Sequence, residues 1–139
     1  MEESQNIKKI KTLLLSNGAN EEQVEGFVAF VLPIVSMYVE NYVTEALDED
    51  VLRDIKQKYE QLSLEDKDLD FNNLFDEKLK ERTGLTGREV ADIFLNDIYN
   101  YLYEIFKATK ITVSEIMEKK IDEAEISSFI ENRLEELLS

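Results

Sequence analysis

The scarcity of turn-forming residues is the feature that most constrains this chain. Only four glycines and one proline occur among its 139 residues. A β-sandwich or barrel needs many short hairpins, whose turns require residues that tolerate a positive φ. Glu, Lys, Leu and Ile are common instead, and most of these lose little side-chain freedom in a helix. The composition therefore predicts an all-α protein.

Two long apolar segments, at about 21–47 and 87–107, are expected to be the central helices. Asn20 with Gln23, and Thr86 with Glu89, have the capping-box spacing that begins a helix. The first segment is apolar on every side around Phe30, which predicts that other helices surround it. We expect Phe30 to share one core with Ile98, at the centre of the second segment.

Shorter amphipathic helices are predicted around these two. Apolar residues recur at helical spacing after Ser4, after Asp48, from Phe71 to Gly84, after Thr112 and from Ile126 onward. The widest break between them, residues 63–70, is too short to require two domains. The expected fold is one domain over residues 1–139, a single compact bundle of six or seven helices.

The charge balance restricts the class of partner. Sixteen basic residues against 31 acidic ones give a net charge of −15. This charge opposes close approach to nucleic-acid phosphates or anionic lipids, and it attracts basic proteins. The apolar run Phe27–Val39 is shorter than the roughly 20 residues that span a bilayer, so no membrane insertion is expected. The absence of cysteine and the acidic N-terminus predict a cytoplasmic protein.

The residues that usually carry catalysis are missing. The chain has no histidine and no cysteine, which removes the commonest general base and thiol nucleophiles. Its four glycines are scattered and form no phosphate-binding loop. The sequence therefore predicts a protein that is not an enzyme.

One segment has the spacing of a calcium-binding loop. Counted from Asp66, the acidic residues Asp68, Asp70 and Glu77 fall at positions 3, 5 and 12 of an EF-hand. Phe71 stands where that loop needs glycine for its turn, and Asp70 is also a good N-cap for the helix that follows. Calcium is the single cofactor for which the sequence offers ligands, and a helix start is the alternative interpretation.

An aromatic group on the second central segment is the candidate partner surface. Tyr99, Tyr103 and Phe106 extend the apolar face of this segment, and such residues pack either in a core or in an interface. Nearby basic residues are few. The basic cluster Lys8, Lys9 and Lys11 is expected to be solvated or to pair with the acidic segment 48–50.

By elimination, the leading functional prediction is a non-enzymatic, helical protein–protein interaction or regulatory module. It would act through an apolar groove around segment 87–107 or through its acidic surface, and a homodimer is a further alternative. The second hypothesis is an inhibitor that imitates nucleic acid and occupies a cationic channel of a DNA- or RNA-handling enzyme. Degenerate EF-hand-like calcium binding through Asp66, Asp68, Asp70 and Glu77 is the third.

Overall fold

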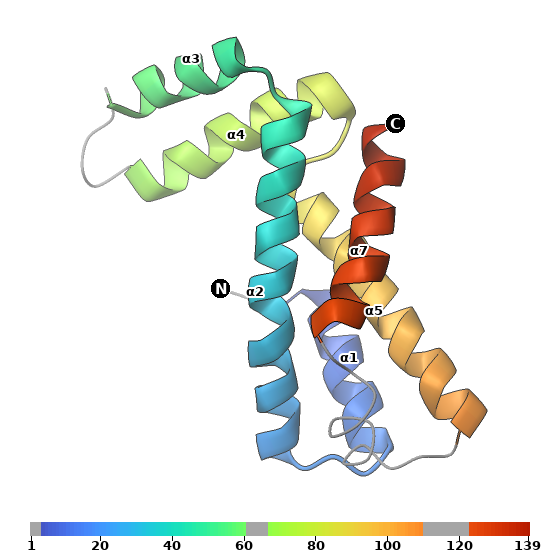
Figure 1. The fold of residues 1–139 in the computed structure, drawn as a ribbon. Helices are drawn as coiled ribbons and strands as arrows, with labels where there is room; N and C mark the ends of the chain where they lie inside the picture. Colours follow the sequence, from blue (N-terminus) through green and yellow to red (C-terminus); the bar gives the residue numbers. More distant parts are fainter. Residues whose placement is uncertain (1–3, 61–66, 110–122) are drawn as a thin grey trace.

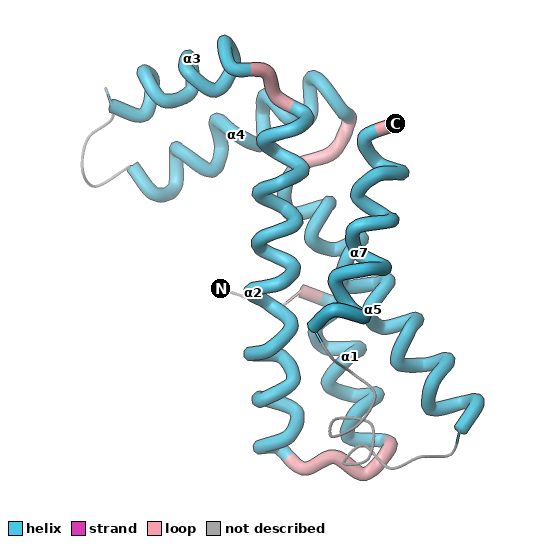
Figure 2. The backbone as a smooth tube through the Cα atoms, in the orientation of Figure 1, coloured by secondary structure: helices cyan, strands magenta, loops and turns pink. Residues whose placement is uncertain are grey.

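The chain is helical throughout the parts that the structure describes. A computed structural model describes residues 4–60, 67–109 and 123–139, without the side chains of 59, 67–74 and 109. These ranges contain α1 (Gln5–Ser16), α2 (Glu21–Ala46), α3 (Glu49–Glu60), α4 (Lys67–Thr83), α5 (Gly87–Thr109) and α7 (Glu123–Leu138). Figure 2 shows helices joined by short loops and no strand within them. The all-α prediction is confirmed.

Local side-chain signals begin the helices where the sequence predicts. The Ile7 N–H donates to the Ser4 hydroxyl at 3.1 Å. Both hydrogen bonds of the capping box between Asn20 and Gln23 are present, at 2.8 and 3.0 Å. The Asp48 carboxylate caps α3 by accepting from the Val51 N–H at 3.1 Å. These groups satisfy backbone donors that have no partner inside the helix.

Two glycines end helices in the left-handed region. Gly18 follows α1 with φ of 98°, and Gly84 follows α4 with φ of 82°. A side chain is strained at such values, so glycine is the usual residue at this position. The end of α4 at Gly84 agrees with the sequence prediction.

Four helices, α1, α2, α5 and α7, form the body of the bundle. In Figure 1, α2 and α7 lie side by side, with α5 crossing behind them and α1 beside the lower half of α2. Helices α3 and α4 pack against each other as a hairpin that extends sideways from the upper end of α2. Only α4 of this hairpin makes extensive contact with α2 and α5.

The hydrophobic core lies along α5. Phe94, Ile98 and Leu102 on this helix are fully buried, and so are Ile126 and Ile130 on α7. From α2 the core receives a stripe of side chains spaced three or four residues apart: Val24, Phe27, Val31, Ile34, Val35, Tyr38 and Tyr42. The predicted bundle around two central apolar helices is thus confirmed.

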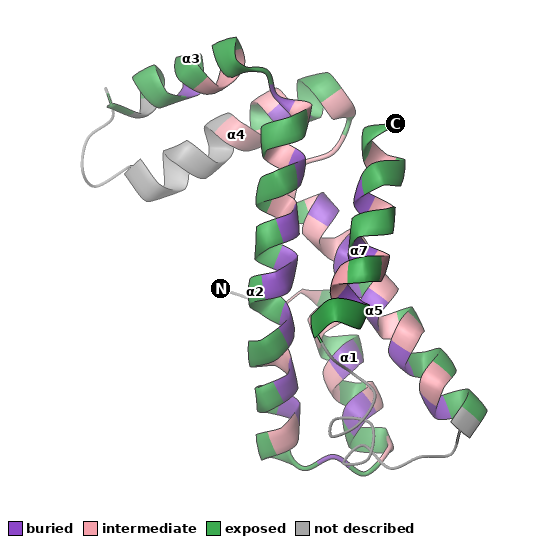
Figure 3. Ribbon diagram, viewed as in Figure 1, coloured by how far each residue is buried: buried purple, intermediate pink, exposed green. Residues whose placement is uncertain are grey.

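The surroundings of α2 differ from the prediction. Phe30 is 37% exposed and Met37 is 44% exposed, so Phe30 does not share the core with Ile98. Figure 3 shows buried residues along one side of α2 and exposed residues along the other. Helices α1, α5 and α7 pack on one side, and the hairpin meets only the C-terminal end, so no helix that the structure describes covers the opposite face of the middle of α2.

One predicted helix start is wrong, and one predicted helix lies outside the described residues. Helix α4 begins at Lys67, earlier than the predicted start at Phe71. Asp70 was expected to precede the helix as its N-cap, but residues 67–70 are themselves helical. The helix predicted after Thr112 lies in residues 110–122, outside the described part of the chain.

Candidate functional site

The predicted calcium ligands fall on or before one helix. Asp66 lies outside the described residues, Asp68 and Asp70 lie in α4 without described side chains, and Glu77 is exposed on the same helix. An EF-hand loop wraps around its ion between two helices, whereas positions 3 to 12 of this spacing form continuous helix. Residues two apart on a helix point about 200° apart, so this backbone differs from that of the motif.

The aromatic group divides between surface and core. Tyr103 is 46% exposed, whereas Phe106 is 8% exposed and belongs to the core. Tyr99 is half-buried and stacks on Tyr103 with ring centroids 6.3 Å apart. The Lys9 ammonium lies 5.7 Å from the centre of the Tyr99 ring, close enough for a cation–π contact. The group therefore helps to join α1 to α5 and leaves one ring at the surface.

The lysines of α1 lie mostly at the surface. Lys8 and Lys9 are exposed, in agreement with the expected solvated face, and the Lys11 ammonium lies 3.4 Å from the Glu25 carboxylate of α2. The alternative, pairing with the acidic segment 48–50, is not what the structure shows for Asp48, which forms an ion pair with Arg82 at 3.2 Å. The bundle places α1 beside the N-terminal half of α2 and away from α3.

A shallow hollow of about 600 Å³ lies between α5 and α7. Its centre is Arg133, whose Nε and Nη2 donate to the two oxygens of Asp97 at 2.8 and 2.9 Å. This fork raises the pKa of Arg133, first through the hydrogen bonds and then through the charge of Asp97. Glu136 also contacts Arg133, at 3.2 Å, so the charge of this guanidinium is already neutralised within the bundle.

A hollow with an apolar floor lies under the α3–α4 hairpin. We call it the corner groove, and its volume is about 730 Å³. Half-buried Val39, Val43, Leu52 and Phe75 form much of its floor, together with buried Leu79. The remaining lining residues are Glu40, Thr44, Asp76, Gly87 and Arg88. Helices α2, α3, α4 and α5 all contribute, so the groove exists only in the folded chain.

The corner of the groove is held by a hydrogen bond between α4 and α5. The Gly87 N–H donates to the Asp76 carboxylate at 3.0 Å. A Cβ on Gly87 would lie 3.4 Å from that carboxylate oxygen and 3.8 Å from Val39. These are ordinary van der Waals distances, and they show that α5 begins directly against α4 and α2.

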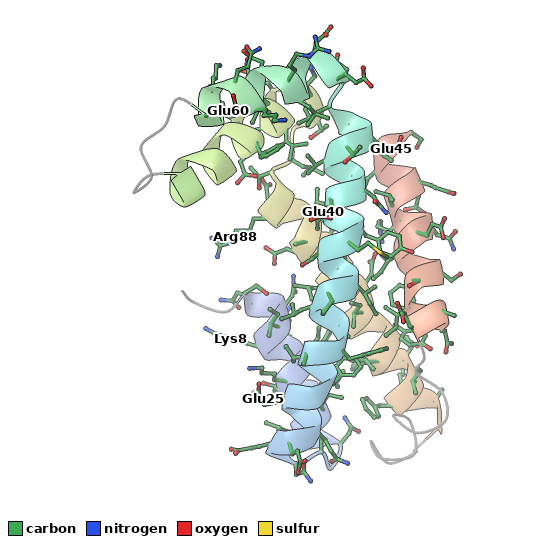
Figure 4. The ribbon with its side chains drawn as sticks, turned by 60° about the vertical axis from the view of Figure 1, so that its left-hand side comes forward. Lys8, Glu25, Glu40, Glu45, Glu60 and Arg88 are labelled. Carbon is green, nitrogen blue, oxygen red and sulfur yellow. The ribbon has the colours of Figure 1, made fainter. Side chains whose placement is uncertain are left out.

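Charges of both signs lie at the rim of the groove. Glu40 and Arg88 are exposed, and neither has an ion pair with another described residue. Figure 4 shows Glu40 on α2 and Arg88 projecting outward from the first turn of α5. Next to Arg88, the Thr86 backbone N–H donates to the Glu89 carboxylate at 3.2 Å, and the Thr86 hydroxyl accepts from the Glu89 backbone N–H at 3.1 Å. Hydrogen bonding to Thr86, first to its backbone, lowers the pKa of Glu89.

Charge is unevenly distributed over the helices. Neighbouring α2 and α7 carry ten acidic residues and one basic residue, Arg133, whereas α1 carries three lysines and no acid. Lys8 on α1 and Glu25, Glu40 and Glu45 on α2 are seen in Figure 4. Two helices therefore supply −9 of the net charge of −15.

The sequence did not locate the corner groove. A groove was expected around segment 87–107, but this one touches α5 only at its first turn, through Gly87 and Arg88. The sequence signal that could have located it is the spacing of Val39 and Val43. These two residues extend the apolar surface of α2 to one side of its buried stripe. The direction of the hairpin, which supplies the opposite wall, has no such signal.

A scan against protein-family models finds no match, and searches of curated proteins and of solved structures find none either. Among the described helices, α2 alone is long and apolar enough to cross a membrane, by length and composition. The core helix of a bundle meets the same criterion, and α2 packs against three other helices of the body.

Proposed function

We propose that this chain is a protein-binding module whose corner groove holds a helical segment of another protein. The observation that carries the proposal is the groove itself, a hollow of about 730 Å³ with an apolar floor and a lining that comes from four helices. An amphipathic helix presents apolar side chains at spacings of three and four residues, which suits such a groove.

The rim supports a helical occupant with charges of both signs. A basic side chain of the partner would meet Glu40, and an acidic one would meet Arg88, both of which lie beside the apolar floor. Charges at a rim contribute mainly to orientation and to the association rate, while the apolar floor contributes most of the affinity. The proposal requires no catalysis, in keeping with a sequence that contains neither histidine nor cysteine.

The experiment compares two variants that add the same charge at different places. Val43→Lys places an ammonium on the groove floor, and Asn132→Lys places one on the exposed side of α7. We expect proteins that co-purify with the wild-type chain to be retained by Asn132→Lys and lost by Val43→Lys. The strongest of them is then produced in pure form, and its dissociation constant for each chain is measured by calorimetry. Equal affinity for both variants contradicts binding in the groove.

A second candidate function, imitation of nucleic acid, is favoured by the distribution of charge. Helices α2 and α7 together carry ten acidic residues and one basic residue. That residue, Arg133, is already paired with Asp97 and Glu136. A partner with a cationic nucleic-acid channel would bind such a surface mainly through charge. Its affinity should fall steeply as the salt concentration rises from about 50 to about 500 mM, a tenfold increase in ionic strength. Binding in the apolar groove should persist over the same range.

A further inference from the structure

The open side of α2 is apolar through its middle. Gly26, Ala29, Phe30, Pro33, Ser36 and Met37 are all exposed and recur at spacings of three and four residues, and we call them the outer face of α2. Only 33% of the most apolar stretch of this helix is buried. Phe30 and Met37 are among the few large hydrophobic side chains exposed on the described surface. An apolar strip of this length is typical of a docking surface.

The ends of this strip are acidic. Glu22 lies one turn before Gly26, Glu40 lies one turn after Met37, and both are exposed. They are about 27 Å apart along the helix, at 1.5 Å per residue. No basic residue occurs anywhere in α2. On the neighbouring helix α1, Lys11 pairs with Glu25 of α2 at 3.4 Å.

We propose that the outer face of α2 docks a cationic amphipathic helix of another protein. The apolar stripe of that helix packs on Phe30, Pro33 and Met37, and lysine or arginine side chains at its two ends reach Glu22 and Glu40. The small side chains between the large ones, at Gly26, Ala29 and Ser36, let the backbone of the partner come close. Charge complementarity with a net charge of −15 selects a cationic partner over a neutral or acidic one.

A second copy of this chain is a poorer occupant of the same face. Two antiparallel copies of α2 would place Glu22 of one against Glu40 of the other, and parallel copies would place each acid against itself. The outer face offers no cation to relieve this repulsion. A membrane surface with anionic lipids is opposed by the same acids.

This inference goes beyond the proposed function, because Phe30 and Met37 do not line the corner groove. Glu40 lies at the edge of both surfaces, and the variants below leave it unchanged. The test therefore pairs a variant of each surface. Phe30→Ser with Met37→Ser removes both large side chains of the outer face, and Val43→Ser with Leu52→Ser removes two from the groove. Circular dichroism and thermal melting establish that each variant is folded before binding is measured.

The probe is a fluorescein-labelled 14-residue peptide of leucine and lysine, with leucines at helical spacing, followed by anisotropy in 150 mM NaCl. A second peptide of the same composition has its leucines scattered around the helix. We expect the wild-type chain to bind the amphipathic peptide at least about tenfold more tightly than the scattered one. The outer-face variant should lose about tenfold in affinity, and the groove variant should keep the wild-type value.

Several results would overturn the inference. Equal affinity of the wild-type chain and the outer-face variant would mean that charge alone attracts the peptide. A loss confined to the groove variant would move the docking site to the corner groove. A wild-type dimer in sedimentation equilibrium that the outer-face substitutions dissociate would make a second copy the occupant. Binding to phosphatidylcholine vesicles, with no binding of the peptide, would make it a lipid surface.

Discussion

Helices α2 and α5 are both long and rich in apolar residues, but only α5 is amphipathic in the folded chain. The residues of α5 that remain exposed are mostly polar or charged, such as Asn96, Asn100 and Glu104. Those exposed at the middle of α2 include Phe30, Pro33 and Met37. The apolar residues of α5 are mostly packed inside the bundle, whereas Phe30, Pro33 and Met37 of α2 have no covering helix among those that the structure describes. An all-round apolar helix therefore indicates a second surface to be covered as well as a core.

The largest expected effect compares two phenylalanines on these helices. Phe94 of α5 is fully buried, and Phe30 of α2 is 37% exposed. Phe94→Ala should lower the free energy of unfolding by about 3–5 kcal/mol, through lost burial and the cavity that remains. Phe30→Ala should lower it by less than about 1 kcal/mol, as is usual for a surface substitution. Urea denaturation of both variants measures the difference, and similar losses would mean that the outer face is covered in the free chain.

Two glycine-to-alanine substitutions should change the free energy of unfolding in opposite directions. Gly84→Ala forces a side chain into a backbone with φ of 82°, and it should cost about 1–2 kcal/mol. Gly26 is helical, and a Cβ there would have no neighbour within 4 Å. Gly26→Ala should therefore stabilise the chain by about 0.5–1 kcal/mol, because alanine favours the helix. Thermal melting of both variants shows the signs, and destabilisation by Gly26→Ala would argue against an open outer face.

A smaller effect is expected where α7 is joined to α5. Asp97→Asn removes the charge that faces the Arg133 guanidinium, whose side chain is 40% exposed. Since solvent screens this pair, the loss in the free energy of unfolding should be about 1 kcal/mol or less. Glu131→Gln on the exposed side of α7 is the control and should leave stability nearly unchanged. A loss above about 3 kcal/mol would show that the pair behaves as a buried one.

The smallest effect is a pH dependence at the start of α5. Hydrogen bonds from Thr86, first from its backbone, lower the pKa of Glu89 from its ordinary value of 4.5. A carboxylate with a lowered pKa in the folded state stabilises the fold above its unfolded pKa, and the contribution disappears as the pH falls through the folded value. Glu89→Gln should therefore lose less melting temperature than the wild-type chain between pH 6 and pH 3, an interval chosen to span carboxylate titration. Identical pH profiles would contradict this role.

Local structure was largely predictable because its causes are local. Ser4, the Asn20–Gln23 pair and the Thr86–Glu89 pair lie within three residues of the backbone groups they bond. The same holds for Gly18 and Gly84, whose positive φ values end α1 and α4. Helix α4 was placed too late, since Asp70 has the residue type of an N-cap but lies inside the helix.

The candidate surfaces were less predictable because they depend on the packing of distant segments. The corner groove joins Val43, Leu52, Phe75 and Gly87, which are brought together only by the direction of the α3–α4 hairpin. The hydrogen bond between Asp76 and Gly87 helps to set that direction. Phe106 was predicted as a partner-binding residue and lies in the core, because α5 presents it to the interior together with Leu102.

By itself, the sequence determined that this protein is an acidic bundle of helices with α5 at its centre. It also determined the residues at which most of those helices begin and end. Spacing, capping and the scarcity of glycine and proline act over a few residues, so they can be interpreted without knowledge of the fold. Only the tertiary structure decided which side of α2 is buried, because every side of that helix is apolar enough to enter a core. The outer face of α2 follows from that choice, and the corner groove follows from the direction of the α3–α4 hairpin.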